Sequence, residues 1–210
     1  MTQADLLINL RTLASDTATS NSIRQEAPIG KTDGANTNFR LQNWPVVAAS
    51  MYLTNGASFR SQSGFTLDPT TGIFVMGTAP TSAVSPWEAD YCFYWFSDTD
   101  HVVFLTQAAS FLGSTDMTSV DPGLIPALLH FALQQFWMRR SSQYAHRYAS
   151  SGGTAGHSVD VVTKAFLDLA KTAEAKATTL RDDFYKRQGQ RNAPSSGTQA
   201  YRVDPYTPRR

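Results

Sequence analysis

The chain has 210 residues, 41% hydrophobic and 17% charged, which is typical of a globular protein with one sizeable core or two small lobes that share one. A single cysteine, Cys92, excludes a disulfide framework within one chain. No stretch approaches the roughly 20 apolar residues of a membrane-spanning helix, and the first residues lack the basic start of a secretion signal. We therefore expect a soluble protein, made in the cytoplasm, that does not bind a membrane.

Charge is distributed unevenly along the chain. Residues 1–121 carry 5 Lys and Arg against 11 Asp and Glu, whereas residues 122–210 carry 13 against 6. An acidic half and a basic half favour head-to-tail packing between neighbouring subunits or proteins. The basic half could alternatively face DNA.

The residue pattern predicts an α+β fold in four parts. We expect an N-terminal helix within residues 1–22, an antiparallel β lobe over residues 23–97, a helical domain over residues 98–188, and an extended C-terminal arm over residues 189–210. The helical bundle would consist of one short and two long helices, with the β lobe inserted into it.

Strand and turn signals fill the region between Asp33 and Phe96. Asn55-Gly56 provides the positive φ that a tight hairpin needs, and Pro69 followed by Gly72 fits a five-residue reversal. The residues between 78 and 90 contain two prolines and are expected to form a loop. The predicted strands lie near residues 37–42, 46–54, 58–67, 73–77 and 91–96.

Helical periodicity dominates the rest of the chain. Leucines at helical spacing predict a helix over residues 3–15, and a short helix from Asp98 should close at Gly113. A long helix should run from Pro126 to about Ser150, buried on nearly every side in its first half. Another should run from Ser158 to about Gln188 and pair with it antiparallel or bind a neighbouring subunit. The apolar stripe of this last helix comprises Val162, Phe166, Leu169, Ala173, Ala177, Leu180 and Phe184.

The last 22 residues show neither helix nor strand periodicity and are rich in glycine, proline and arginine. Three apolar side chains in this stretch could anchor an extended arm in a groove of a partner. The predicted partner-binding residues are Arg191, Tyr201, Arg202, Val203, Tyr206, Arg209 and Arg210.

Catalytic and metal-binding patterns are missing from the sequence. The four histidines form no metal-binding spacing, and there is no phosphate loop, nucleophile elbow or dinucleotide fingerprint. Asp98, Asp100, Asp116 and Asp121 fit helix caps and turns better than a cation site. We therefore expect no enzyme, no cofactor and no bound metal.

Arginines gather near the end of the helix predicted over 126–150. Arg139, Arg140 and Arg147, with Tyr144 and Tyr148 between and beside them, could contact DNA or a neighbouring subunit. The other interpretation is an ordinary solvated helix end, or a surface that forms ion pairs with an acidic neighbour.

The β region resembles a module of tailed-bacteriophage structural proteins. The residues that carry the resemblance are Asp33-Gly34-x-Asn36-Thr37-x-Phe39-x-Leu41, the hairpin Tyr52-x-x-Asn55-Gly56, the reversal from Phe65-Thr66-Leu67-Asp68 to Gly72-Ile73, and the ending Thr78-Ala79-Pro80. They cover about 50 residues. The arrangement of the helical half, with its extended arm, is similar to that of the head-to-tail adaptor (connector) proteins of these phages.

This resemblance implies a structural virion protein in the neck of the particle. Twelve copies would form a ring that joins the portal to the tail and continues the DNA channel through which DNA is ejected, without sequence recognition. The arm would enter the portal, and the β lobe would contact capsid, tail, stopper or nozzle proteins. Two other hypotheses are a tail or baseplate module that binds the host, and a DNA-binding protein that uses the basic helical end.

Overall fold

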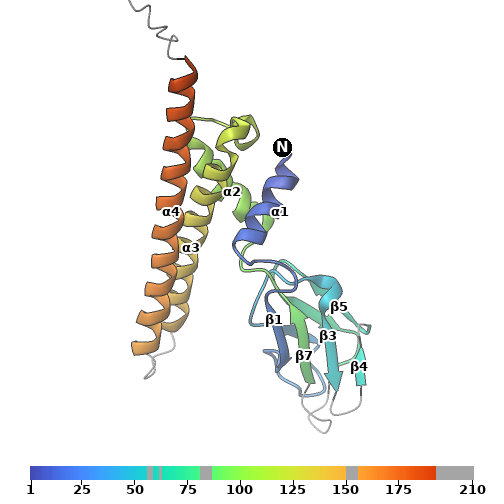
Figure 1. Cartoon of the computed structure of the whole chain (residues 1–210). Coiled ribbons are helices and arrows are strands. Elements are labelled where there is room, and N and C mark those ends of the chain that lie inside the picture. Colours follow the sequence, from blue (N-terminus) through green and yellow to red (C-terminus); the bar gives the residue numbers. More distant parts are fainter. Residues whose placement is uncertain (56–58, 62, 81–86, 150–155, 193–210) are drawn as a thin grey trace, which may run out of the picture.

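The chain has an α+β fold of two lobes (Figure 1). The computed structural model describes residues 1–55, 59–61, 63–80, 87–149 and 156–192, with the backbone alone at residues 55, 59–60, 147–149, 156–159 and 190–192. Helices α1 (Gln3–Leu13), α2 (Asp98–Phe111), α3 (Ile125–Ala149) and α4 (Gly156–Asn192) form the helical lobe. The predicted α+β class is confirmed.

Local signals fix the ends of the two short helices. Both α1 and α2 begin with a capping box, formed by Thr2 with Asp5 and by Ser97 with Asp100. In each box the hydroxyl oxygen accepts a hydrogen bond from the backbone N–H of the aspartate, and the carboxylate accepts one from the backbone N–H of the hydroxyl residue. Gly113 follows α2 with φ of +78°, a conformation that costs glycine little, and it ends the helix as the sequence predicts.

The two long helices stand side by side as an antiparallel pair (Figure 1). Trp137 of α3 stacks on Phe166 of α4 at 5.6 Å between ring centroids, and the Ser141 hydroxyl donates to the Thr163 carbonyl oxygen at 3.3 Å. The first half of α3 is buried on several sides, as predicted. Small side chains let α4 approach closely, since its buried residues among those described are Ala170, Ala173 and Ala177.

The sequence prediction for α4 was wrong at two points. Leu169 was assigned to the buried stripe, but it is 45% exposed because the helical pitch places Ala170 against α3 instead. The helix also extends to Asn192, so residues 189–192 are helical rather than part of an extended arm. Gly189 does not end the helix, because one glycine costs only about 1 kcal/mol in a helix interior.

Two antiparallel sheets form the β lobe. The four-stranded sheet has the order β1-β7-β3-β4, and the three-stranded sheet has the order β2-β6-β5. Inward-facing residues of both sheets, such as Phe39, Leu53, Phe74 and Tyr91, share one hydrophobic core. The strands are β1 (Ser22–Glu26), β2 (Asn38–Arg40), β3 (Tyr52–Asn55), β4 (Phe59–Ser61), β5 (Phe65–Asp68), β6 (Ile73–Met76) and β7 (Trp87–Cys92).

The predicted reversals are confirmed, whereas several strand limits are not. Strands β3 and β4 pair antiparallel on either side of the predicted Asn55-Gly56 turn, of which Gly56 lies outside the described residues, and Gly72 has φ of +68° between β5 and β6. The strand predicted over 46–54 is interrupted by a 3-10 helix at Ala48–Ser50, and the one over 58–67 is two strands in different sheets. Strand β7 begins in the predicted loop and ends before the aromatic residues 93–96. Strand β1 was not predicted.

The chain crosses between the lobes twice. Residues 14–21 lead out of the helical lobe, and residues 93–97 lead back into it from β7 to α2. The side chain of Trp95 packs against the hydrophobic cores of both lobes. The two crossings therefore lie together at one junction.

Candidate functional site at the lobe junction

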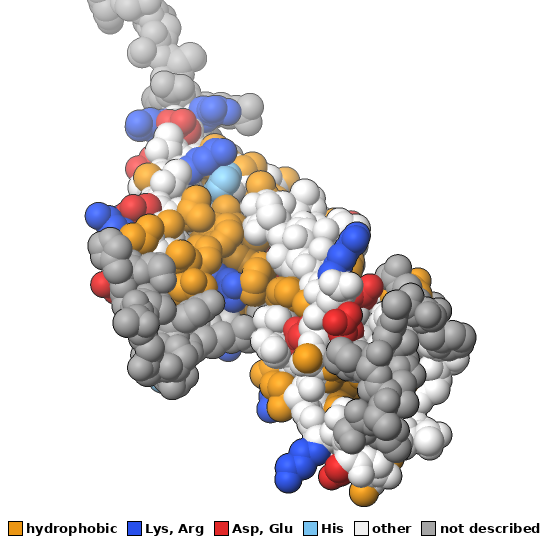
Figure 2. Space-filling model, turned by 90° about the horizontal axis from the view of Figure 1, so that it is seen from below, with side chains coloured by type: hydrophobic (Ala, Val, Ile, Leu, Met, Phe, Trp, Pro, Cys, Tyr) orange, Lys and Arg blue, Asp and Glu red, His pale blue; other side chains and the backbone are white. Residues whose placement is uncertain are grey.

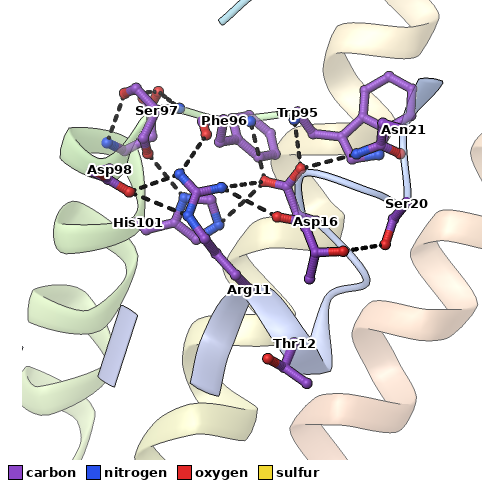
Figure 3. A network of polar contacts seen from close by, with 12 residues as sticks. Arg11, Thr12, Asp16, Ser20, Asn21, Trp95, Phe96, Ser97, Asp98 and His101 are labelled. Atoms are coloured by element: carbon purple, nitrogen blue, oxygen red, sulfur yellow. Dashed lines mark hydrogen bonds and ion pairs between the residues drawn. The ribbon is translucent and has the colours of Figure 1, made fainter. Parts of the chain in front are cut away.

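A buried carboxylate fastens the two crossings to each other (Figure 3). Asp16, which is fully buried, accepts hydrogen bonds at Oδ1 from the backbone N–H of Trp95 at 2.6 Å and from Asn21 Nδ2 at 3.1 Å. Its Oδ2 accepts from the Phe96 N–H at 3.4 Å and from Arg11 Nη1 at 3.2 Å. A side chain in the outgoing crossing thus satisfies backbone donors of the returning one.

Arg11 extends this network from α1 to the start of α2. Its guanidinium donates to the Phe96 carbonyl oxygen at 3.2 Å and to Asp98 Oδ1 at 2.8 Å. The same group lies over the ring of Tyr94, 4.1 Å from the ring centroid. One planar cation with several donors can hold these separate elements in a fixed relation.

His101 on α2 completes the buried cluster. Its Nδ1 lies 2.9 Å from the Ser97 carbonyl oxygen, which can only accept, so this hydrogen bond places the hydrogen on Nδ1. In the neutral ring Nε2 is then an acceptor; it lies 3.5 Å from Asp16 Oδ2 and has no hydrogen-bond partner among the described residues. Two acceptors face each other there, and the pair can hold one proton between them.

Burial shifts the pKa of both members of this pair. Burial raises the pKa of Asp16, against the hydrogen bonds from Trp95 and Phe96 and the charge of Arg11, which lower it. Burial shifts the pKa of His101 in the opposite direction and lowers it to about 4, although its hydrogen bond to Ser97 opposes this shift. Both shifts favour the uncharged forms.

Two of the predicted arginines lie at this junction. Arg140 is 7% exposed, and its guanidinium carbon lies 3.1 Å from the ring centroid of Trp95. Arg139 is about half exposed and forms an ion pair with Asp100 at 3.1 Å. Arg140 therefore packs inside the junction rather than on an exposed basic surface. Contact of Arg139 with DNA or another subunit stays a prediction.

A cleft opens between α3 and the β lobe beside Arg140. Its volume is about 450 Å³. The Tyr91 hydroxyl fixes the β-lobe wall: it donates to Glu26 Oε2 at 2.6 Å and accepts from the backbone N–H of Asn43 at 3.2 Å. The described residues that line the cleft are Asn43, Trp44, Phe93, Trp95, Arg139, Arg140, Ser142, Gln143 and His146.

The long helices expose apolar side chains away from the junction. Figure 2 shows a broad area of hydrophobic side chains on the helical part of the molecule. Helix α4 packs against α3 and, near its end, against the 3-10 helix Pro122–Leu124, which leaves much of its circumference uncovered. Among the described side chains of α3 and α4, the large hydrophobic residues that are at least 40% exposed are Met138, Val161, Leu167, Leu169 and Tyr185.

Most of the predicted partner-binding residues lie outside the described part of the chain. Arg191 belongs to the last turn of α4 and Arg147 to the end of α3, and the structure describes only the backbone of both. The predicted residues outside the described part of the chain are Tyr201, Arg202, Val203, Tyr206, Arg209 and Arg210.

Three of the four aspartates interpreted as caps or turn residues cap helices, whereas Asp98 in the first turn of α2 pairs with Arg11 instead. Asp100 belongs to the capping box of α2, and Asp116 and Asp121 accept from backbone N–H groups at the starts of two 3-10 helices. Within the described ranges no group of three or more His, Cys, Asp or Glu residues could hold a metal ion. No helix there combines the length and apolarity needed to cross a bilayer.

Sequence reasoning missed Arg11, Asp16 and His101, the centre of the network. Asp16 stands in a Ser/Thr-rich stretch, where an aspartate is normally a turn residue, and its partners Trp95 and Phe96 lie about 80 positions away. No local pattern records such a contact. Scans against protein-family models, curated proteins and solved structures each found no match to this chain.

Proposed function

We propose that the chain is a structural virion protein of a tailed bacteriophage and forms a ring in the neck of the particle. Twelve copies join the portal to the tail and continue the channel through which DNA leaves the head. The arm that follows α4 binds the portal, and the β lobe faces capsid or tail proteins. The chain acts mechanically and needs no catalytic residue or cofactor.

The uncovered surface of α4 is the observation that carries this proposal. The helix has 37 residues, about 55 Å in length, yet only three alanines are buried among its described side chains, with Leu180 and Phe184 packed half-buried on the helical core. A helix that exposes Leu167, Leu169 and Tyr185 can bury more apolar area against another copy. Each copy would use α4 to contact a different face of the next copy. When this contact repeats around a closed circle, the copies form a ring.

The unequal charges of the two halves of the sequence support unlike surfaces at such an interface. Attraction between the acidic first half of one copy and the basic second half of the next would give the head-to-tail direction that a ring requires. Each copy contributes one portal contact. Many weak contacts then act together, because each further contact forms within an assembly that is already held.

The interface is tested by Leu169→Glu, with Val103→Glu on α2 as the control. The two residues are 45% and 41% exposed, so each substitution disturbs the fold of the single chain to a similar extent. Leu169→Glu should weaken every subunit contact by at least about 1 kcal/mol, since it removes partial burial of a leucine and places a charge there. Sedimentation should show smaller species for Leu169→Glu than for Val103→Glu. Equal assembly by both variants would contradict an α4 interface.

A further inference from the structure

The cleft between α3 and the β lobe has the chemistry of a binding site. Its volume of about 450 Å³ lies in the range of typical ligand pockets. Trp44 and Phe93 provide apolar walls from the β lobe, and Trp95 continues this wall toward the junction. The side-chain amide of Gln143 can pair with an extended backbone. Apolar walls with a few convergent polar groups can bind a short segment of chain.

Positive charge is concentrated on the α3 side of the cleft. Arg139 and Arg140 line it with His146, and none of the described lining residues is acidic, although Arg139 also forms an ion pair with Asp100 of α2 outside the lining. A further cation, Arg40, stacks on the outer wall, with its guanidinium carbon 4.1 Å from the ring centroid of Trp44. The rigid stacking of Arg140 on Trp95 holds its charge in place before a ligand arrives. The cleft therefore favours an anionic group.

The surroundings favour a carboxylate on a peptide over a nucleic acid. Nonspecific DNA binding needs basic side chains spread along several phosphates, whereas these cations converge in one cleft. Asp98, with a side chain 74% exposed, and Asp100 lie at the neighbouring start of α2 and would repel a polyanion. A peptide with one or two acidic residues meets less of this repulsion than a polyanion and can place an aromatic or aliphatic side chain on the tryptophan wall.

We propose that this cleft binds an acidic peptide segment of a partner protein, one that carries an aromatic or aliphatic residue next to its Asp or Glu. The carboxylate binds the half-exposed Arg139, the charge of the buried Arg140 adds to the attraction, and the apolar side chain lies on Trp44 and Phe93. Binding by a single chain suffices, so the site does not depend on ring formation by α4.

Selection from a displayed library of random peptides on the purified full chain tests this. We expect enriched sequences that combine Asp or Glu with an aromatic or branched residue. Synthetic copies of them should bind Arg139→Glu about tenfold or more weakly than the original chain. Lys171→Glu is the matched control, because it reverses a charge that also lies near a carboxylate, 3.7 Å from Asp168. Its affinity for the peptides should be unchanged.

Arg139→Gln should give an intermediate loss of peptide affinity, and it replaces Arg139→Glu in the test if the charge reversal prevents folding. The proposal would be overturned if none of the enriched peptides required Arg139 for binding. It would also be overturned if single-stranded DNA oligonucleotides competed for the cleft and lost binding in Arg139→Glu, since the site would then be one for nucleic acid. Sedimentation of Arg139→Glu is measured in parallel, so that a failure of assembly is distinguished from a failure of the cleft.

Discussion

The Asp16–His101 pair predicts that two single substitutions give opposite pH dependence of folding stability. The pKa of His101 is about 4 in the folded chain and about 6.5 when unfolded, so the unfolded chain binds more protons between these values. Stability therefore rises with pH across this window through His101. The pKa of Asp16 is raised in the folded chain, which binds more protons above pH 4, so its contribution falls as pH rises.

The two contributions oppose each other in the intact chain and separate in the variants. In Asp16→Asn only His101 of the pair still titrates, and the free energy of unfolding should rise by on the order of 3 kcal/mol from about pH 4 to about pH 6.5. In His101→Gln only Asp16 of the pair still titrates, and the free energy of unfolding should fall as the pH rises above about 4. The charges near the pair, Arg11, Asp98, Asp100 and Arg140, remain in both variants.

Urea unfolding of the intact chain and both variants across this pH window measures these slopes. Tryptophan fluorescence reports both lobes, since Trp44 and Trp87 pack on the β core and Trp137 on the helical core. The intact chain should show the weakest pH dependence of the three. Slopes of the same sign in Asp16→Asn and His101→Gln would refute the reasoning.

Two further predictions concern the junction and the arm. Asp16→Ala leaves the buried N–H of Trp95 without its acceptor at 2.6 Å and should lower the free energy of unfolding by about 3–5 kcal/mol. Asp98→Ala removes an exposed partner of Arg11 and should lower it by less than about 1 kcal/mol. Urea unfolding compares the two variants, and equal losses of stability would contradict the structure. Deletion of residues 191–210 should leave the thermal unfolding of the fold nearly unchanged but abolish binding to the portal in a pull-down, and unimpaired binding would contradict the role of the arm.

The helices could be predicted because their determinants are local. The spacing of leucines and the helix-ending Gly113 each act within a few residues, and the structure places α1 and α2 accordingly. The alanines of α4 similarly predict close approach to a neighbouring helix. The error at Leu169 arose because a leucine is more hydrophobic than the adjacent Ala170, yet the pitch of the helix decides which residue faces α3.

The junction and one strand could not be predicted because their determinants are distant in sequence. Strand β1 pairs with β7 more than 60 positions away, across an irregular register where Gln25 has φ of +57°. Nothing in the composition of residues 22–26 indicates this pairing. The contact of Asp16 with Trp95 is of the same kind, so the cleft that it helps to position was also missed. The candidate arginines were recognised, but the burial of Arg140 was not.

Electron microscopy of assembled phage particles, with the copy number and position of this chain counted, tests the proposed role most directly. We predict twelve copies in a ring beneath the portal, with the α4 helices at the subunit contacts and the residues after Asn192 bound to the portal. Three or six copies further down the tail would contradict the connector role. A chain found outside the virion would contradict the structural role altogether.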